Sequence, residues 1–213
     1  MSIGDIKIKD NGEELVDISK YGILFEPVYF KMKLSGSQKG LLRKGVIDKI
    51  LLAREELPKD YNFKVWDGYR PRTVQKKLWD KYEKDFRKEN LDWSDEKIFK
   101  IVSQFVADPE DIKRIPNHAT GGAVDLTIIN NFGKELDMGT GFDELIPRAA
   151  SDYYKQKKKC SLREKKIAEN RELLKVLANV GFVQYKYEWW HFDYGNQSWA
   201  DAKKKKFAIY GEI

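Results

Sequence analysis

The only two histidines of the chain each stand close to a carboxylate residue. His118 begins the segment His-Ala-Thr-Gly-Gly-Ala-Val-Asp, which ends at Asp125, and His191 ends the segment Glu-Trp-Trp-His, which starts at Glu188. Two imidazoles and one carboxylate are a common protein ligand set for catalytic zinc, which keeps a fourth position for water. The pattern therefore predicts one zinc ion per chain, held by His118, Asp125 and His191.

The spacing of these residues sets conditions on the backbone. Gly121 and Gly122 lie between His118 and Asp125, and a glycine pair lets the chain turn sharply enough for the two side chains to converge. Residues three apart on an ideal strand point to opposite faces, so Glu188 can join the site only through a bulge, a strong twist or a strand end. The alternative interpretation is an ordinary strand histidine and a capping aspartate.

Two further residues could act on a bound substrate. If zinc is present, Glu188 can take the proton of the zinc-bound water, whose pKa the metal lowers to about 7. Its alternative role is a surface salt bridge with Lys186. Arg70 ends the segment Trp-Asp-Gly-Tyr-Arg directly before Pro71, so its backbone is held firmly and its guanidinium could stabilise an oxyanion. A structural ion pair with Asp67 is the alternative.

The helices and strands that must position these residues follow one another in an irregular order. Apolar residues at helical spacing, together with capping signals, predict helices over residues 38–57, 73–87, 95–106 and 161–180. Runs rich in aromatic and β-branched residues predict strands over 63–66, 123–129 and 182–194. This order has no regular βαβ rhythm, so we expect an α+β fold: one domain over residues 1–213, with a largely antiparallel sheet flanked by helices and the zinc site in a cleft on the sheet.

Composition excludes several classes of protein. With 41% hydrophobic and 35% charged residues in 213, the chain is typical of a soluble globular domain. The formal charge is +6, but 34 acidic residues are interspersed with 40 basic ones, which indicates a mixed surface and no nucleic-acid partner. No apolar stretch approaches the length of a membrane span, and no apolar segment follows a basic start. We therefore expect a cytoplasmic protein without a membrane partner, while the sequence leaves the oligomeric state open.

Three segments together resemble a known family. Trp-Asp-Gly-Tyr-Arg-Pro at 66–71, the H-x-x-G-x-A-x-D pattern at 118–125 and Glu-Trp-Trp-His at 188–191 occur in the order and spacing of the VanX-type D-alanyl-D-alanine dipeptidases. These belong to a wider family of zinc D,D-peptidases. The resemblance extends from about residue 17 to residue 194, which is nearly the whole chain.

The resemblance implies zinc-dependent hydrolysis of D-alanyl-D-alanine to two D-alanines, for dipeptide recycling or glycopeptide resistance. Zinc ligands, base and transition-state stabiliser would be the residues already named. Asp143 would receive the substrate ammonium, and Tyr21 would lie near the same end. The family's usual serine is Pro116 here, which has neither a hydroxyl nor an N–H, so Asn117 or a backbone group would replace its contact, or substrate preference would differ.

Two other functions compete with this interpretation. A related zinc carboxypeptidase or endopeptidase would act on peptidoglycan stem peptides. The alternative from another class is a catalytically silent zinc-binding module or a basic module that binds nucleic acid, and the presence of Glu188 beside a full ligand set counts against silence.

Overall fold

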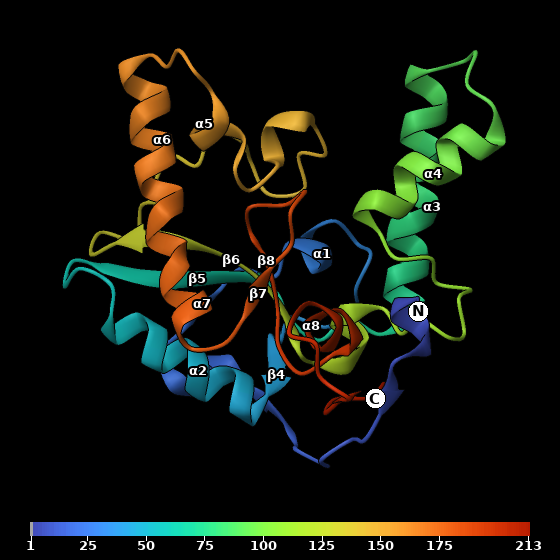
Figure 1. The fold of residues 1–213 in the computed structure, drawn as a ribbon, viewed down its shortest axis with the longest axis horizontal. Coiled ribbons are helices and arrows are strands. Elements are labelled where there is room, and N and C mark those ends of the chain that lie inside the picture. The colour runs from blue at the N-terminus through green and yellow to red at the C-terminus, as the bar shows by residue number, and fades with distance from the viewer. Residues whose placement is uncertain (1) are drawn as a thin grey trace.

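The computed structural model describes residues 2–213, and its centre is a five-stranded sheet (Figure 1). The strand order is β3-β5-β6-β8-β7. The β3–β5 pair is parallel, and the other three pairs are antiparallel. The α+β class is therefore confirmed, but the sheet is mixed, because β3 enters beside β5 from the N-terminal segment. The strands are β3 (Leu24–Phe25), β5 (Tyr61–Asp67), β6 (Ala123–Asn130), β7 (Val183–Gln184) and β8 (His191–Asp193).

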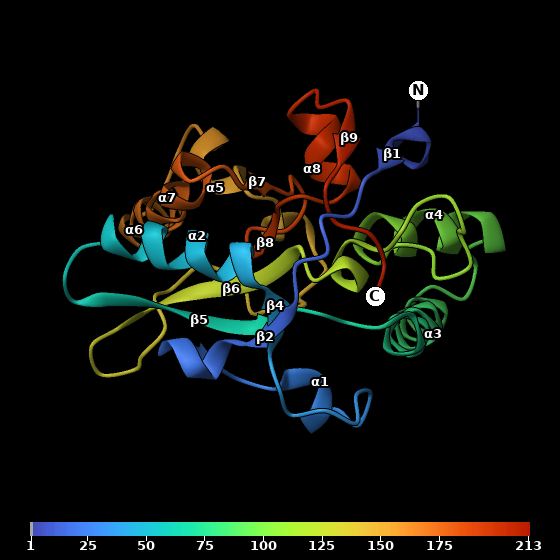
Figure 2. The same ribbon diagram turned by 90° about the horizontal axis from the view of Figure 1, so that it is seen from below.

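Helices cover both faces of this sheet. Figure 2 shows α2 (Lys44–Glu55), α6 (Leu162–Glu172) and α7 (Val176–Asn179) on one side, and α1 (Val28–Lys31) on the other. The main core lies between these layers and includes fully buried Phe63 and Leu126 from the two central strands. The sheet is thus held rigidly where it carries the candidate site residues.

Two helices project beyond the sheet and form one wall of the site. They are α3 (Arg72–Glu89) and α4 (Asp95–Phe105), which pack together around a separate apolar cluster that includes Leu78 and Val102 (Figure 1). Pro71 directly precedes α3, and the Ser94 side chain caps α4 by accepting a hydrogen bond from the N–H of Lys97. Both helices match the sequence prediction closely.

Three predicted elements differ from the structure. The helix expected over 38–57 begins only at Lys44, because 41–43 form β4 (Leu41–Arg43) beside β2 (Leu15–Asp17). The helix expected over 161–180 is α6 and α7 joined by a 3-10 turn. The strand expected over 182–194 is a hairpin of β7 and β8 whose connecting turn carries Glu188. That turn buries the rings of both Trp189 and Trp190 in the main core.

The remaining elements are short. None of the helices in residues 2–213 is long and apolar enough to cross a membrane. The short elements are β1 (Lys7–Ile8), β9 (Phe207–Ala208), α5 (Tyr153–Gln156), α8 (Gln197–Ala202) and the 3-10 turns η1 (Ile3–Asp5), η2 (Ile18–Tyr21), η3 (Asn117–Thr120), η4 (Pro147–Ala149) and η5 (Leu173–Lys175).

Candidate active site

The register of the central strands brings three acidic or imidazole side chains into one row. Asp67 at the end of β5 pairs with Asp125 of β6, and Asp125 pairs with His191 at the start of β8. Residues directly opposite on neighbouring strands have Cβ atoms about 5 Å apart. The row lies at one end of the sheet, so residues distant in the sequence meet there.

His118 reaches this row from the 3-10 turn η3, which precedes β6. Gly121 ends that turn with φ 68°, a conformation that glycine adopts without the steric cost of a side chain. A Cβ atom on Gly122 would lie 2.4 Å from the carbonyl oxygen of Tyr194, so the chain could not pass there with a larger residue. The glycine pair therefore allows His118 to turn back over Asp125, as predicted.

The three predicted ligands converge in the interior. His118 Nε2 lies 3.1 Å from His191 Nδ1, which lies 3.0 Å from Asp125 Oδ1. His118 Nε2 also lies 3.4 Å from Asp125 Oδ2, and all three residues are buried. Ligands about 2.0–2.1 Å from a tetrahedral zinc ion are themselves roughly 3.3 Å apart. The donor atoms thus have the chemistry and the spacing of a three-ligand zinc site.

Each histidine is oriented by a second carboxylate. The other ring nitrogen of His118, Nδ1, lies 2.8 Å from the Gly68 carbonyl oxygen and 3.2 Å from Asp67 Oδ2. The other ring nitrogen of His191, Nε2, lies 3.1 Å from Asp193 Oδ1. Such partners fix the tautomer and ring orientation of a ligating histidine. Asp67 and Asp193, from two different strands, therefore hold the imidazoles so that His118 Nε2 and His191 Nδ1 face each other.

The aspartate and the histidines of the ligand set stabilise one another's charged forms. Burial opposes ionisation of Asp125, but the two histidines more than offset it and lower the pKa of its carboxyl well below the ordinary range. Burial also disfavours a charged His191, yet the carboxylates of Asp193 and Asp125 raise its pKa well above 6.5. A metal ligand must be a neutral imidazole, so metal binding at His191 competes with a proton.

Glu188 lies beside the ligand set but outside it. Its Oε2 atom is 3.9 Å from His191 Nδ1, beyond hydrogen-bond distance, and its side chain is buried. The N–H of His191 bonds to the Glu188 carbonyl oxygen across 3.3 Å, so the two residues belong to one turn. Burial raises the pKa of the Glu188 carboxyl well above 4.5, as do the nearby charges of Asp125 and Asp143. Because Glu188 lies in the turn before β8 and not on the strand, its side chain does not have to point to the face opposite His191. The raised pKa makes this carboxylate near the metal ligands strongly basic.

Arg70 belongs to the same site. Its backbone N–H bonds to the carbonyl oxygen of His118 across 3.1 Å, and its Nε atom lies 3.3 Å from Asp67 Oδ2. Its NH1 group bonds to the hydroxyl of Tyr29 across 3.2 Å. Burial opposes the charge, but Tyr29 and the surrounding aspartates raise the pKa of Arg70 further, so the guanidinium stays positive. The expected ion pair with Asp67 and a position in the site therefore occur together.

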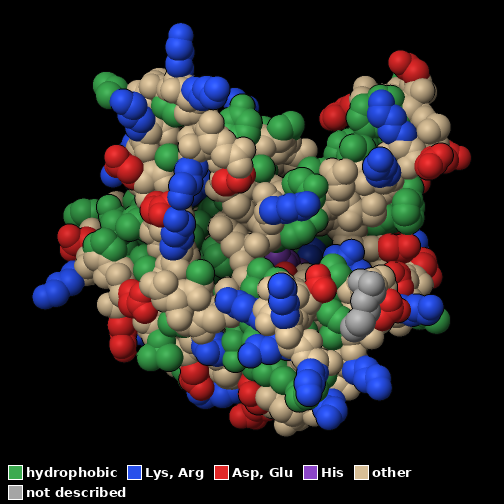
Figure 3. Space-filling view, viewed as in Figure 1, with side chains coloured by type: hydrophobic (Ala, Val, Ile, Leu, Met, Phe, Trp, Pro, Cys, Tyr) green, Lys and Arg blue, Asp and Glu red, His purple; other side chains and the backbone are tan. Residues whose placement is uncertain are grey.

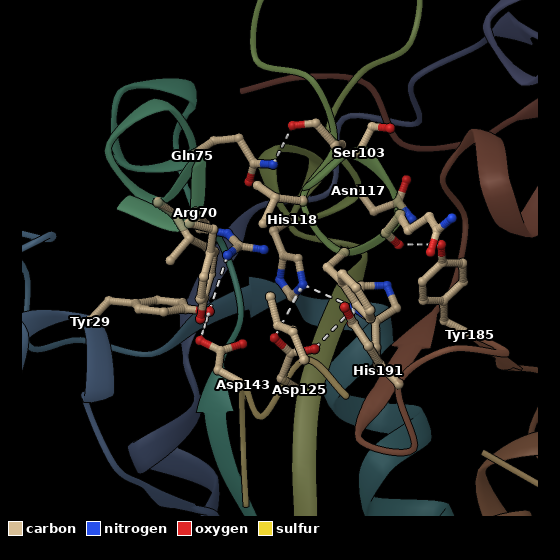
Figure 4. A pocket seen from close by; sticks show the side chains of 18 of the residues that line it. Tyr29, Arg70, Gln75, Ser103, Asn117, His118, Asp125, Asp143, Tyr185 and His191 are labelled. Atoms are coloured by element: carbon tan, nitrogen blue, oxygen red, sulfur yellow. Dashed lines mark hydrogen bonds and ion pairs between the residues drawn. The ribbon is translucent and has the colours of Figure 1, made fainter. Parts of the chain in front are cut away.

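Asp143 lies between Arg70 and Asp125, as Figure 4 shows. The Tyr29 hydroxyl donates a hydrogen bond to its Oδ2 atom across 2.8 Å. Burial and the negative charge of Asp125 raise the pKa of the Asp143 carboxyl to about 6. Its backbone has φ 58°, an uncommon conformation outside glycine that often marks functional positions. The preceding ring, Phe142, stacks on Trp66 at 4.8 Å and holds Asp143 in place.

One cavity collects nearly all the predicted residues. Figure 3 shows histidine at the bottom of a hollow between two projecting lobes. Tyr21 is not among the residues that line this cavity; the Lys44 ammonium lies over its ring, and Tyr29 occupies the place beside Asp143 instead. Trp189 and Trp190 are core residues and do not line the cavity. The predicted residues that line it are Arg70, His118, Asp125, Asp143, Glu188 and His191.

Sequence reasoning missed several residues of the site. Asp193 follows His191 by two positions on a strand, so both side chains point to the same face, a signal that was available. Asp67 was considered only as a partner for Arg70. Tyr29 and Tyr185 gave no signal, because each reaches the cavity from a segment without a recognisable motif.

A buried set of two histidines and one aspartate, with a further buried carboxylate beside it, has the composition of a zinc metallopeptidase site. Residues 19–209 match the D-ala-D-ala dipeptidase family. A D-alanyl-D-alanine dipeptidase of Synechocystis sp. is 30% identical over 98% of this chain and 95% of its own length. The Escherichia coli protein of that name is 32% identical over 61% of this chain and 53% of its own length.

One solved structure is also similar, but remotely. It is a mutant of the vancomycin resistance D,D-pentapeptidase VanY in complex with Zn(II), with a TM-score of 0.44 and 14% identity over 81% of this chain and 83% of that one. A likeness this distant bears on neither fold nor function. On the family match and the full-length relative, the chain belongs to the D-ala-D-ala dipeptidase family.

Proposed function

We propose that this protein hydrolyses D-alanyl-D-alanine to two molecules of D-alanine. The observation that carries the proposal is one cavity lined by the ligand set, by Glu188 and by Asp143. Asp143 offers a carboxylate to a free ammonium, and a dipeptide places its ammonium only one residue from the bond to be cut. The names of the Synechocystis and Escherichia coli relatives support the same substrate.

His118, Asp125 and His191 would hold the zinc ion, which supplies a Lewis acid and lowers the pKa of water. Glu188 takes a proton from the attacking water at its carboxylate and returns it to the nitrogen that leaves when the C–N bond breaks. Arg70, charged and fixed by Asp67, faces the negative charge that develops on the carbonyl oxygen. Asp143 and the Tyr29 hydroxyl orient the ammonium end.

We also propose that residues 1–213 act as a single zinc dipeptidase domain. The sheet takes strands from residues 24 to 193, and the ligand set takes residues from 118 to 191. Any division of the chain between these limits would separate site residues from the strands that support them.

The rival enzyme is a carboxypeptidase or endopeptidase that acts on peptidoglycan stem peptides. Such an enzyme must admit the peptide that precedes the scissile bond. Here that side of the cavity holds Asp143, whose carboxylate would lie against an uncharged amide and lose its partner. A silent zinc-binding module is disfavoured because it has no use for a buried carboxylate at the position of Glu188.

The test combines a substrate panel with metal analysis of the same preparation. We expect about one zinc per chain and cleavage of D-alanyl-D-alanine in preference to a stem pentapeptide with the same end. Chelation should abolish the activity, and added zinc should restore it. Preferential cleavage of the pentapeptide would show that the dipeptidase assignment is wrong, and active protein without a transition metal would refute the mechanism.

A further inference from the structure

The cavity holds a second arginine, for which the proposed mechanism has no use. We infer that Arg114 binds the C-terminal carboxylate of the dipeptide and so selects substrates with a free carboxyl end. The inference rests on the proposed function and extends it to the end of the substrate opposite Asp143.

Arg114 lies at the cavity wall, and its Nε atom has no hydrogen-bond acceptor among the described residues. It lies in the loop between α4 and η3, where its backbone N–H bonds to Asp111 Oδ1 across 3.0 Å. The next N–H, that of Ile115, bonds to Gln197 Oε1 across 3.0 Å, so the loop is fixed on both sides of the arginine. Arg114 lines the cavity, and its Nε atom is buried with no hydrogen-bond partner in residues 2–213. A buried donor left unpaired is unfavourable, and a ligand that accepts its hydrogen bond removes this cost.

A substrate carboxylate needs a cationic partner in the cavity. A free dipeptide carries an ammonium and a carboxylate, and the arginines among the described residues that line the cavity are Arg70 and Arg114. Arg70 Nε also lacks a hydrogen bond, but it lies 3.3 Å from Asp67 Oδ2, and its NH1 group is bonded to Tyr29. Arg114 therefore remains to neutralise the carboxylate, and its guanidinium can do so through two parallel hydrogen bonds.

The two ends of the site lie on opposite sides of the ligand set. Figure 4 shows Asp143, Tyr29 and Arg70 on one side of the imidazoles, and Asn117 and Tyr185 on the other. Arg114 and Tyr185 line the cavity together, and the positive charge of Arg114 partly opposes the burial that raises the pKa of the Tyr185 phenol. An ammonium held at Asp143 would thus place the amide bond at the ligand set and the carboxylate toward Arg114.

The side chain that follows Pro116 is already engaged within the protein. Pro116 has no side-chain donor, and Asn117 or a backbone group was the expected replacement. The Asn117 amide is held at both ends: its Nδ2 bonds to Asp193 Oδ2 and its Oδ1 accepts from Ser198 Oγ, both across 3.0 Å. Asn117 thus supports the partner of His191, and Arg114 is the nearby side chain with an unused donor.

The test compares D-alanyl-D-alanine with its C-terminal amide in the zinc-loaded protein. We expect wild type to prefer the free carboxylate by about 30-fold or more in kcat/KM, as for a desolvated charge pair. Arg114→Met should bring the two substrates close to equality by slowing cleavage of the carboxylate alone. Arg114→Lys should retain part of the preference, and Arg148→Met, which removes an exposed arginine outside the cavity, should retain all of it.

Calorimetry provides a readout apart from turnover. In a Glu188→Gln background, adding Arg114→Met should weaken binding of D-alanyl-D-alanine by a similar factor, while binding of the amide stays unchanged. Zinc content and thermal unfolding identify any variant that has lost its fold, in which case Arg114→Lys carries the test. If Arg114→Met keeps the wild-type preference, the inference is overturned and the proposed function stands. If wild type cleaves neither substrate, the proposed function fails first.

Discussion

The carboxylate of Asp143 gives the sharpest test of how this site selects its substrate. Replacing it by asparagine keeps the size of the side chain, and asparagine tolerates the left-handed backbone with φ 58° at this position. The change removes one negative charge opposite the substrate ammonium. Truncating one partner of a desolvated charge pair costs roughly 2–5 kcal/mol, or about 30-fold and more in kcat/KM. We therefore expect Asp143→Asn to lose this factor on D-alanyl-D-alanine and to lose little on the N-acetylated dipeptide.

The same carboxylate predicts a pH dependence with a definite sign. Its pKa is raised from 3.8 to about 6, so it is ionised above that pH and protonated below it. The preference for the free dipeptide over the N-acetylated one should fall as the pH decreases through about 6. Loss of metal in acid acts on both substrates alike, so the ratio of their kcat/KM values isolates Asp143. In Asp143→Asn this ratio should be low and independent of pH.

The raised pKa also predicts that the variant is more stable. Below pH 3.8 the carboxyl is protonated in the folded and the unfolded protein, so it does not change the free energy of unfolding. Between pH 3.8 and about 6 the ionised form is favoured in the unfolded protein, so the free energy of unfolding falls, and above about 6 the full loss is present. The difference corresponds to at most roughly 3 kcal/mol, and solvent that reaches this partly exposed side chain reduces it. Asp143→Asn should raise Tm by a few degrees at pH 7.5 and change it little at pH 4. Asp152→Asn, which removes an exposed charge, is the matched control.

Two outcomes would contradict this reasoning. If Asp143→Asn slowed both dipeptides equally, Asp143 would act in the chemistry or in folding and not on the ammonium. If the variant kept its preference for the free dipeptide, another group would bind that end of the substrate.

The other predictions concern the metal ligands and their neighbours. Glu188→Gln should lower kcat by about 10²–10⁴-fold with zinc retained, whereas His191→Ala should lose the metal; near-normal turnover of the first would exclude Glu188 as the base. Arg70→Lys should lower kcat by roughly 10²-fold at unchanged zinc content, because a point charge cannot replace a fixed guanidinium; a change in KM alone would mean that it only binds substrate. Asp67→Asn should weaken zinc binding about 10–100-fold in a chelator competition, since it orients His118.

The ligand set is the part of the site that could be predicted from the sequence. His118 and His191 are the only histidines, and a glycine pair and an aspartate at fixed spacing constrain what the first of them can do. The helices at 72–89 and 95–105 were equally accessible, because a proline, a capping serine and helical periodicity are local signals. Chemistry and local structure at these positions depend on neighbouring residues in the chain.

The hairpin at 183–193 shows why other features could not be predicted. A run rich in Tyr, Trp and Phe has strong strand propensity, yet residues 185–190 form the turn between β7 and β8, and this turn carries the buried rings of Trp189 and Trp190. The turn places Glu188 beside His191 instead of on the opposite face. Strand propensity is a local preference, and pairing with the distant strand β6 decides which residues of the run form β8.

Which residues meet in the site is determined by the tertiary structure alone. The sequence offered Tyr21 as the candidate near the ammonium end, and only the packing of α1 over the sheet brings Tyr29 and not Tyr21 to Asp143. The row of Asp67, Asp125 and His191 exists because three strands pair in one register, with a bulge in β5 between Val65 and Asp67. Sequence spacing determines which residues can bind a metal, whereas strand register determines which of them meet, because register depends on contacts between distant segments.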